Sequence, residues 1–218
     1  MPPDSPTIGR PRYRPNGTDR LTLAQADSLF EAVVFASENG LHLRGHLTVH
    51  WSLTMAFDDN DGKRAALVRE GLKKVLHRRG IPWCGVWVRE CKAQTNVTHD
   101  HLLFHLPPQL CTGTALQDLE LSILRLVGRH GGGLTHRDAV KLTLYLQGAD
   151  GRYLLKGGGR EVWAKYNLPS SWRRMQGRIF GKRCGVTQNI GPTARRRAGY
   201  DGESVLWQRA RDLSLKLS

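Results

Sequence analysis

The sequence predicts an α+β fold in which a central antiparallel β-sheet is flanked by helices. Segments with helical hydrophobic periodicity are interspersed with segments whose apolar residues recur with the period of a strand. The second and third strand segments are separated only by a short loop, roughly Cys91 to Asn96. Because parallel strands need a much longer crossover connection, we expect these two strands to pair as an antiparallel hairpin.

The first two helices carry recognisable start and stop signals. Thr22, followed three residues later by Gln25, forms a capping-box signature, and Gly40 is expected to end the first helix. The second helix, expected over residues 63–79, carries apolar side chains on one face and Lys or Arg on the other. It should end before Pro82, since proline cannot continue a helix.

The remaining elements follow from alternation and from breakers. Strands are expected at residues 46–51, 83–90, 97–106 and 140–146. The last of these alternates polar with apolar residues, which favours a strand although a helix is also open there. A third amphipathic helix is expected over residues 114–129, closed by the glycines 131–133, and a short helix over residues 152–156.

The charge is the first indication of function. The chain has 218 residues with 33 Lys and Arg against 19 Asp and Glu, a net charge of +14, which favours a polyanion such as nucleic acid as partner over a merely soluble basic surface. No apolar run is long enough to cross a membrane, and residues 1–20 do not resemble a secretory signal. The four cysteines lack C-x-x-C spacing, so we expect reduced thiols in a cytoplasmic protein without membrane contact.

Three regions are expected along the chain. Residues 1–20 read as a flexible basic arm, residues 21–160 as the main folded domain and residues 161–218 as a basic, aromatic extension that binds DNA. Between residues 163 and 200 there are nine Lys or Arg and no acidic residue. The candidate DNA contacts are Trp172, Arg173, Arg174, Arg178, Lys182, Arg183, Arg195, Arg196 and Arg197. The alternative is a basic surface whose aromatic side chains simply pack on the core.

The strand at residues 97–106 carries a candidate metal site. His99 and His101 lie two residues apart, so on a strand they share one face and can bind the same divalent ion. Glu90 ends the preceding strand and can fall beside them across the hairpin. Such a mixed nitrogen and oxygen site suits Mg²⁺ or Mn²⁺. The alternative is a chance H-x-H pattern.

A candidate nucleophile lies in the short helix. Tyr153 and Lys156 are three residues apart and therefore share a helix face. A neighbouring ammonium favours the phenolate form of a tyrosine, which is the nucleophilic form. The alternative is a tyrosine that belongs to the core.

Taken together and in this order, three segments resemble the HUH endonucleases: Val49-His50-Trp51, the strand from His99 to Pro107, and Tyr153-Leu-Leu-Lys156-Gly157. The resemblance is to single-tyrosine rolling-circle replication initiators of bacterial plasmids and phages, and it covers residues 45–159. Residues 181–191 are similar to a downstream block of those proteins.

The resemblance implies the HUH fold, a palm or ferredoxin-like architecture, and an activity. His99 and His101, with Glu90 as third ligand, would hold the cation, and Tyr153 would attack a phosphate of single-stranded or hairpin origin DNA. The products would be a 5′-phosphotyrosine adduct and a free 3′-OH, with Lys156 stabilising the reacting oxygens. No P-loop is present, so a host helicase and polymerase would complete replication.

The sequence departs from the usual HUH pattern at two points, and several alternative functions remain open. The residue between the histidines, usually hydrophobic, is Asp100, which is expected to face the packed side of the sheet unless it reaches solvent near the strand start. Tyr145 lies eight residues before Tyr153, so a single nucleophile is expected. Alternatives are a non-catalytic replication regulator, a transposase or relaxase of the same superfamily, and a phosphodiesterase using water. His46, His50 and His105 are expected at the surface or beside the site.

Overall fold

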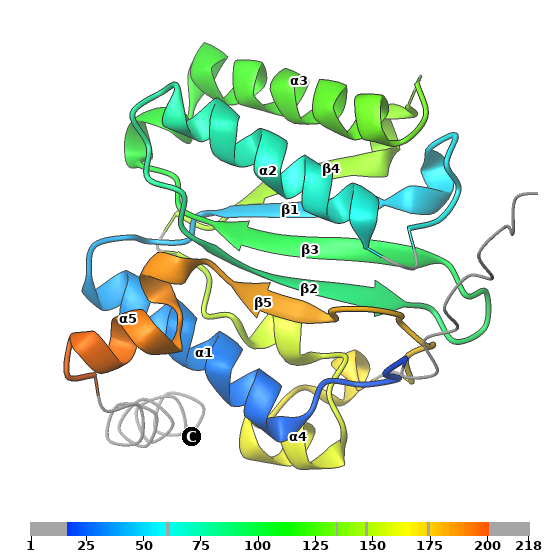
Figure 1. Cartoon of the computed structure of the whole chain (residues 1–218), viewed down its shortest axis with the longest axis vertical. Helices are drawn as coiled ribbons and strands as arrows, with labels where there is room; N and C mark the ends of the chain where they lie inside the picture. The colour runs from blue at the N-terminus through cyan, green and yellow to red at the C-terminus, as the bar shows by residue number, and fades with distance from the viewer. Residues whose placement is uncertain (1–16, 60–61, 134, 147, 174, 201–218) are drawn as a thin grey trace, which may run out of the picture.

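The computed structural model describes residues 17–200, apart from 60–61, 134, 147 and 174. Its centre is an open five-stranded sheet with the strand order β4-β1-β3-β2-β5 (Figure 1), in which every neighbouring pair is antiparallel. The strands are β1 (Gly45–His50), β2 (Gly85–Cys91), β3 (Thr98–Phe104), β4 (Val140–Leu144) and β5 (Cys184–Val186). The predicted α+β class with an antiparallel sheet is therefore confirmed.

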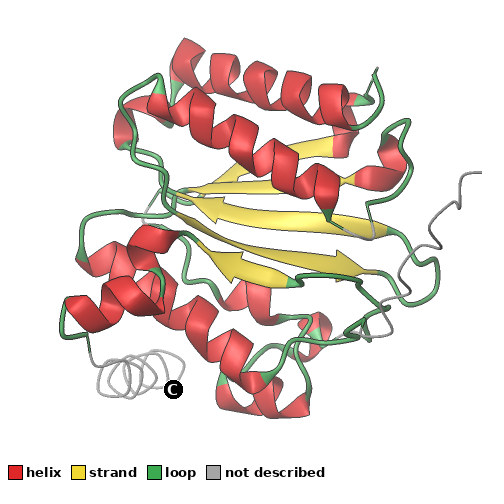
Figure 2. Cartoon of the chain, viewed as in Figure 1, coloured by secondary structure: helices red, strands yellow, loops and turns green. Residues whose placement is uncertain are grey.

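Helices cover both faces of the sheet. Figure 2 shows α2 (Lys63–His77) and α3 (Gly113–His130) side by side on one face. On the opposite face lie α1 (Leu23–Glu38), α4 (Arg160–Lys165) and α5 (Pro192–Arg197). The buried side chains accordingly form two hydrophobic clusters, one on each side of the sheet. None of the helices in the described part of the chain is long and apolar enough to cross a membrane.

Alternate residues of the central strands supply the two clusters. Leu47 and Leu102 belong to the cluster under α2 and α3, whereas Val88 and Leu103 belong to the cluster on the α1 side. This division follows from the strand geometry, in which successive side chains point to opposite faces. His101 lies two residues before Leu103 on β3, so its side chain points to the same side of the sheet, the α1 side.

Local signals fix most element ends. The capping box of α1 is present, with Gln25 N donating to Thr22 Oγ1 at 3.3 Å and Thr22 N donating to Gln25 Oε1 at 3.0 Å. β1 stops at His50, one residue earlier than expected, because Trp51 begins a 3₁₀ turn and its side chain is fully buried. β4 likewise ends at Leu144 rather than at residue 146.

The hairpin of β2 and β3 sets the register on which the site depends. Its strands pair antiparallel, as expected, with Glu90 opposite His99 and Val88 opposite His101. In the connecting loop Asn96 adopts a left-handed conformation, with φ of 52°, which asparagine tolerates better than most residues. The hairpin therefore places the predicted metal ligands next to one another.

The sequence did not reveal β5. This strand has three residues, too few for a period-two pattern, and it pairs with β2 at the edge of the sheet. Leu168, Cys184 and Ile190 belong to the same hydrophobic cluster as α1. The described part of the expected C-terminal extension thus shares a core with residues 21–160. Residues 1–16 of the expected N-terminal arm lie outside the described residues.

Candidate metal centre and tyrosine site

Three potential metal ligands come together on the α1 side of the sheet. Glu90, His99 and His101 are all buried, and one ligand atom from each lies within 4.8 Å of the other two. The shared face of alternate residues on β3 and the opposition of Glu90 and His99 across the hairpin produce this grouping. The buried cluster can hold a metal ion, as the sequence predicted.

The protonation states of the cluster suit a metal ion. Burial by itself would raise the pKa of Glu90, but the adjacent histidines and Lys156 outweigh burial and hold that pKa well below its usual range. Burial lowers the pKa of His101 to about 4, despite the opposing effect of Glu90. Near neutral pH the cluster therefore offers a carboxylate and a neutral imidazole, which are the forms that bind metals.

Two buried atoms of the cluster have no hydrogen-bond partner. His99 Nε2 lies 3.1 Å from Glu90 Oε2, whereas His99 Nδ1 and Glu90 Oε1 are buried without any partner. Because an unsatisfied buried polar atom costs about 1–3 kcal/mol, such atoms call for an explanation. A cation that accepts these lone pairs would supply it, so the donor set fits a divalent ion.

Tyr153 and Lys156 face each other as predicted. They lie on and just after a 3₁₀ turn, Arg152–Leu155, that follows Gly151, whose φ of 80° allows the chain to reverse there. A 3₁₀ turn has three residues per turn, so residues three apart lie one above the other. Lys156 Nζ donates to the Tyr153 hydroxyl oxygen at 2.7 Å.

Lys156 joins the tyrosine to the ligand cluster. Its Nζ lies 3.0 Å from His101 Nε2 and 3.2 Å from Glu90 Oε2, while remaining hydrogen-bonded to Tyr153. The Tyr153 ring also meets the His101 ring edge to face, with centroids 5.3 Å apart. The two features predicted separately from the sequence therefore form one site, in which a phenol can be activated beside a bound cation.

Further histidines surround the ligands. His46 Nε2 and Thr48 Oγ1 each lie 3.1 Å from His101 Nδ1, and the His50 ring stacks on His99 with centroids 5.6 Å apart. Their position follows from the pairing of β1 with β3, which sets Thr48 opposite His101. The expectation that His105 lies beside the site is wrong. Its Nδ1 lies 3.0 Å from the carbonyl oxygen of His42.

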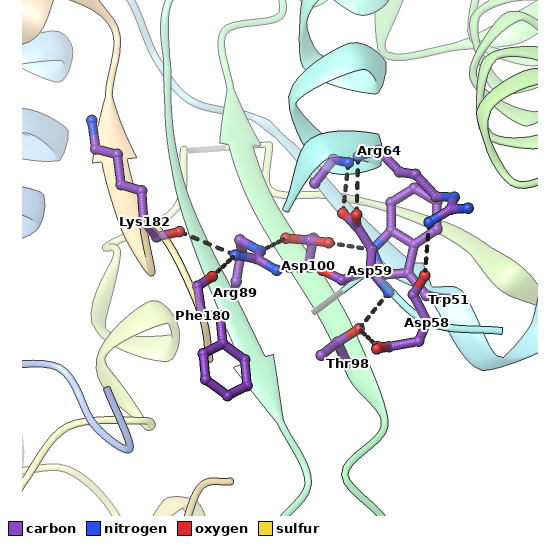
Figure 3. Close-up of polar contacts among 10 residues, drawn as sticks. Trp51, Asp58, Asp59, Arg64, Arg89, Thr98, Asp100, Phe180 and Lys182 are labelled. Atoms are coloured by element: carbon purple, nitrogen blue, oxygen red, sulfur yellow. Dashed lines mark hydrogen bonds and ion pairs between the residues drawn. The ribbon is translucent and has the colours of Figure 1, made fainter. Parts of the chain in front are cut away.

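Asp100 faces away from the ligands and into the packed side of the sheet, as expected. Its carboxylate accepts a hydrogen bond from Trp51 Nε1 and lies 3.5 Å from Arg89 Nε (Figure 3). Burial raises the pKa of Asp100 to about 6, although Arg89 and Trp51 oppose the shift. The acidic residue between the two histidines is thus held by partners that a hydrophobic residue would not need.

The same buried arginine connects three parts of the fold. Figure 3 shows Arg89, on β2, donating to the carbonyl oxygens of Phe180, Lys182 and Asp59. The Asp59 carboxylate in turn accepts from the backbone of Arg64 and Ala65 in the first turn of α2, at 2.9 and 2.8 Å. This network fixes the start of α2 and the segment before β5 against the strands that carry the ligands.

The predicted DNA contacts divide into exposed and buried side chains. Arg173, Arg178, Lys182, Arg196 and Arg197 are exposed, and Trp172 is half-buried. Trp172 lies edge to face with Tyr153, with ring centroids 5.4 Å apart. Arg174 lies outside the described residues.

Arg183 and Arg195 do not fit the predicted role in DNA binding. Both are buried, at 2% and 5% exposure. Arg183 donates to the carbonyl oxygens of Thr18 and Gly177, and Arg195 donates to Glu31 and to the carbonyl oxygen of Ile190. Their guanidinium groups are therefore part of the folded core and are not available to a phosphate backbone.

Replacing Arg195 should affect stability far more than replacing its neighbour. Arg195→Ala leaves Glu31 and the Ile190 carbonyl without their donor, so we expect a loss of roughly 2 kcal/mol or more in the free energy of unfolding. Arg196→Ala removes an exposed side chain and should change it by less than about 0.5 kcal/mol. Urea unfolding of both variants measures the difference, and equal stability would contradict the structural role.

No family model matches this chain, and neither the curated proteins nor the solved structures contain a significant match. The case for a function therefore depends on the site itself.

Proposed function

We propose that this protein nicks and rejoins single-stranded DNA with Tyr153 as nucleophile and a divalent cation as cofactor. The observation that carries the proposal is the single ammonium of Lys156, which lies 2.7 Å from the Tyr153 hydroxyl and 3.2 Å from Glu90 of the ligand cluster. A nucleophile and an acid–histidine metal cluster within one hydrogen-bond network is what a metal-assisted transesterification requires.

The ligand cluster would hold the cation. Glu90, His99 and His101 supply one carboxylate and two imidazoles, which suit Mg²⁺ or Mn²⁺ at a site with open positions. When bound, the cation would polarise a scissile phosphate and offset its negative charge.

The chain's own residues would carry the remaining steps. The Tyr153 oxygen forms a bond to phosphorus and loses its proton, while the bond from phosphorus to the 3′ oxygen breaks and that oxygen takes up a proton. Lys156, already hydrogen-bonded to the phenol oxygen, stabilises it as negative charge develops. The resulting 5′-phosphotyrosine conserves the energy of the phosphodiester, so the reverse reaction can rejoin the strand.

The surroundings of Tyr153 suit a single strand of DNA. Trp172 lies beside the tyrosine and is half-exposed, so it can stack on a base next to the scissile phosphate. Elsewhere in the C-terminal segment, the exposed Arg178, Lys182, Arg196 and Arg197 can contact the backbone. A free 3′-OH can prime synthesis, so we propose initiation of rolling-circle replication at origin DNA, with helicase and polymerase supplied by the host.

A covalent-capture assay tests the proposal. The full-length protein is incubated with labelled single-stranded DNA tiled across the replicon that encodes it, with Mn²⁺ or with EDTA, and analysed on a denaturing SDS gel. We expect an SDS-resistant protein–DNA band with Mn²⁺ and none with EDTA. Binding that falls steeply with salt but yields no band would favour the non-catalytic regulator, whereas metal-dependent cleavage without a band would favour water as nucleophile.

A further inference from the structure

The hydrogen bonds around Lys156 determine which nitrogen of His101 carries its proton. Lys156 Nζ lies 3.0 Å from His101 Nε2, and an ammonium can only donate hydrogen bonds. Glu90 Oε2 lies 3.7 Å from the same nitrogen, beyond hydrogen-bond distance, so the contact with Lys156 assigns His101 Nε2 as the unprotonated nitrogen. An uncharged imidazole carries one N–H, so with Nε2 accepting from Lys156 the proton of His101 resides on Nδ1.

The protonated nitrogen of His101 points at two acceptors. Its Nδ1 lies 3.1 Å from His46 Nε2 and 3.1 Å from Thr48 Oγ1. If His46 accepts at Nε2, its own proton must lie on Nδ1, which is 3.3 Å from the hydroxyl oxygen of Tyr145. The His46 and Tyr145 rings are stacked, with centroids 5.8 Å apart and planes 21° apart, which holds the two side chains in register.

We infer that His46 and Tyr145 are positioning residues that keep His101 in its metal-binding tautomer. With protons on Nδ1 of both histidines, His101 Nε2 presents its lone pair toward Glu90 and Lys156. With the opposite arrangement, His46 would donate to His101 Nδ1, and the proton on Nε2 would block the ligand position. When His46 Nε2 accepts a hydrogen bond from His101 Nδ1, it therefore favours the tautomer in which His101 Nε2 is free to bind the metal.

The burial of the pair supports this assignment. His46 is 6% exposed, and its Nε2 faces the protonated nitrogen of His101 at 3.1 Å, so at this contact it can only accept. Partners that fix the orientation and tautomer of a ligating histidine typically change metal affinity by about 10- to 100-fold when they are removed. The inference builds on the proposed metal centre and assigns residues that lie outside the set of ligands.

The test uses the full-length protein without DNA. Its imidazole nitrogens are labelled with ¹⁵N, and the tautomer of His101 is read by long-range ¹H–¹⁵N correlation in metal-free buffer near pH 7.5, with Mn²⁺ affinity measured by calorimetry. We expect His101 to be protonated on Nδ1 in the wild type. His46→Phe should shift His101 toward the Nε2-protonated form and weaken Mn²⁺ binding about 10- to 100-fold.

A conservative variant separates positioning from packing. In His46→Gln the amide oxygen can accept from His101 Nδ1, so we expect the wild-type tautomer and most of the affinity to return. The matched control is His50→Phe, because His50 stacks on His99 and not on His101, and this variant should leave the His101 tautomer unchanged.

Several results would overturn the inference. These are a wild-type His101 protonated on Nε2, an unchanged tautomer and affinity in His46→Phe, or a failure of His46→Gln to restore either property. Since no DNA is used, these outcomes are independent of the covalent-capture assay. Failure of that assay alone would count against strand cleavage and leave the assignment of the tautomer intact.

Discussion

Tyr153→Phe is expected to abolish covalent capture of DNA while leaving the protein folded and able to bind Mn²⁺. The substitution removes only the hydroxyl oxygen that would form the bond to phosphorus, and loss of a nucleophile of this kind lowers rates by about 10⁴-fold or more. The ring can keep its edge-to-face contacts with His101 and Trp172. The measurement is the yield of SDS-resistant adduct per mole of folded protein, with far-UV circular dichroism as the check on folding.

Two other tyrosines are matched controls for this result. Tyr166 is buried, and its hydroxyl donates to Asp27 Oδ1 at 2.6 Å, so Tyr166→Phe should leave the adduct yield unchanged unless it lowers stability. Tyr145→Phe keeps the nucleophile and should still form adduct, at a reduced level where Mn²⁺ is limiting. An adduct that persists in Tyr153→Phe and disappears in Tyr145→Phe would show that the nucleophile is Tyr145.

Glu90→Gln is expected to weaken Mn²⁺ binding more than any change outside the ligand set. It removes the one carboxylate of the cluster and leaves the Lys156 ammonium, 3.2 Å from Glu90 Oε2, without its counter-charge. The affinity should fall by more than the roughly 100-fold that a partner of a ligand contributes. Calorimetric titration with Mn²⁺ measures this directly, and adduct formation should fall with it.

The appropriate control for Glu90 is the other buried carboxylate of the hairpin. Asp100 faces Trp51 and Arg89 on the opposite side of the sheet, so Asp100→Asn should change the affinity for Mn²⁺ by only a few fold. Stability must be measured in parallel, because Arg89 loses its ionic partner in this variant. Equal losses of Mn²⁺ affinity in Glu90→Gln and Asp100→Asn would contradict the assignment of Glu90 as a ligand.

The candidate site could be predicted from the sequence because its residues lie on the β2–β3 hairpin and on one short turn, Arg152–Leu155. Strand alternation puts His99 and His101 on one face, and a short loop limits where Glu90 can lie. The three-residue spacing of Tyr153 and Lys156 likewise determines that they meet, whether the turn is an α-helix or a 3₁₀ helix. These relations are local, and local geometry is what a sequence pattern encodes.

The structural features that the sequence did not predict depend on contacts between segments that are distant along the chain. β5 has too few residues to show a period, and its place at the edge of the sheet comes from pairing with β2 about 100 residues earlier. Arg195 is indistinguishable by sequence from Arg196 beside it, yet only Arg195 reaches Glu31 on α1. The contact between His46 and His101 similarly requires the pairing of β1 with β3, which the sequence does not specify.

The most direct measurement is the identification of the residue that carries DNA in the adduct. Trypsin cleaves after Arg152 and Lys156, so Tyr153 and Tyr145 fall into adjacent but separate peptides. After nuclease trimming of the adduct, mass spectrometry should find a nucleotide, joined through its 5′ phosphate, on the peptide Tyr153–Lys156, and only when Mn²⁺ was present. A nucleotide on any other peptide, or an adduct that forms equally well in EDTA, would contradict the proposal that Tyr153 and the Glu90–His99–His101 cluster act as one site.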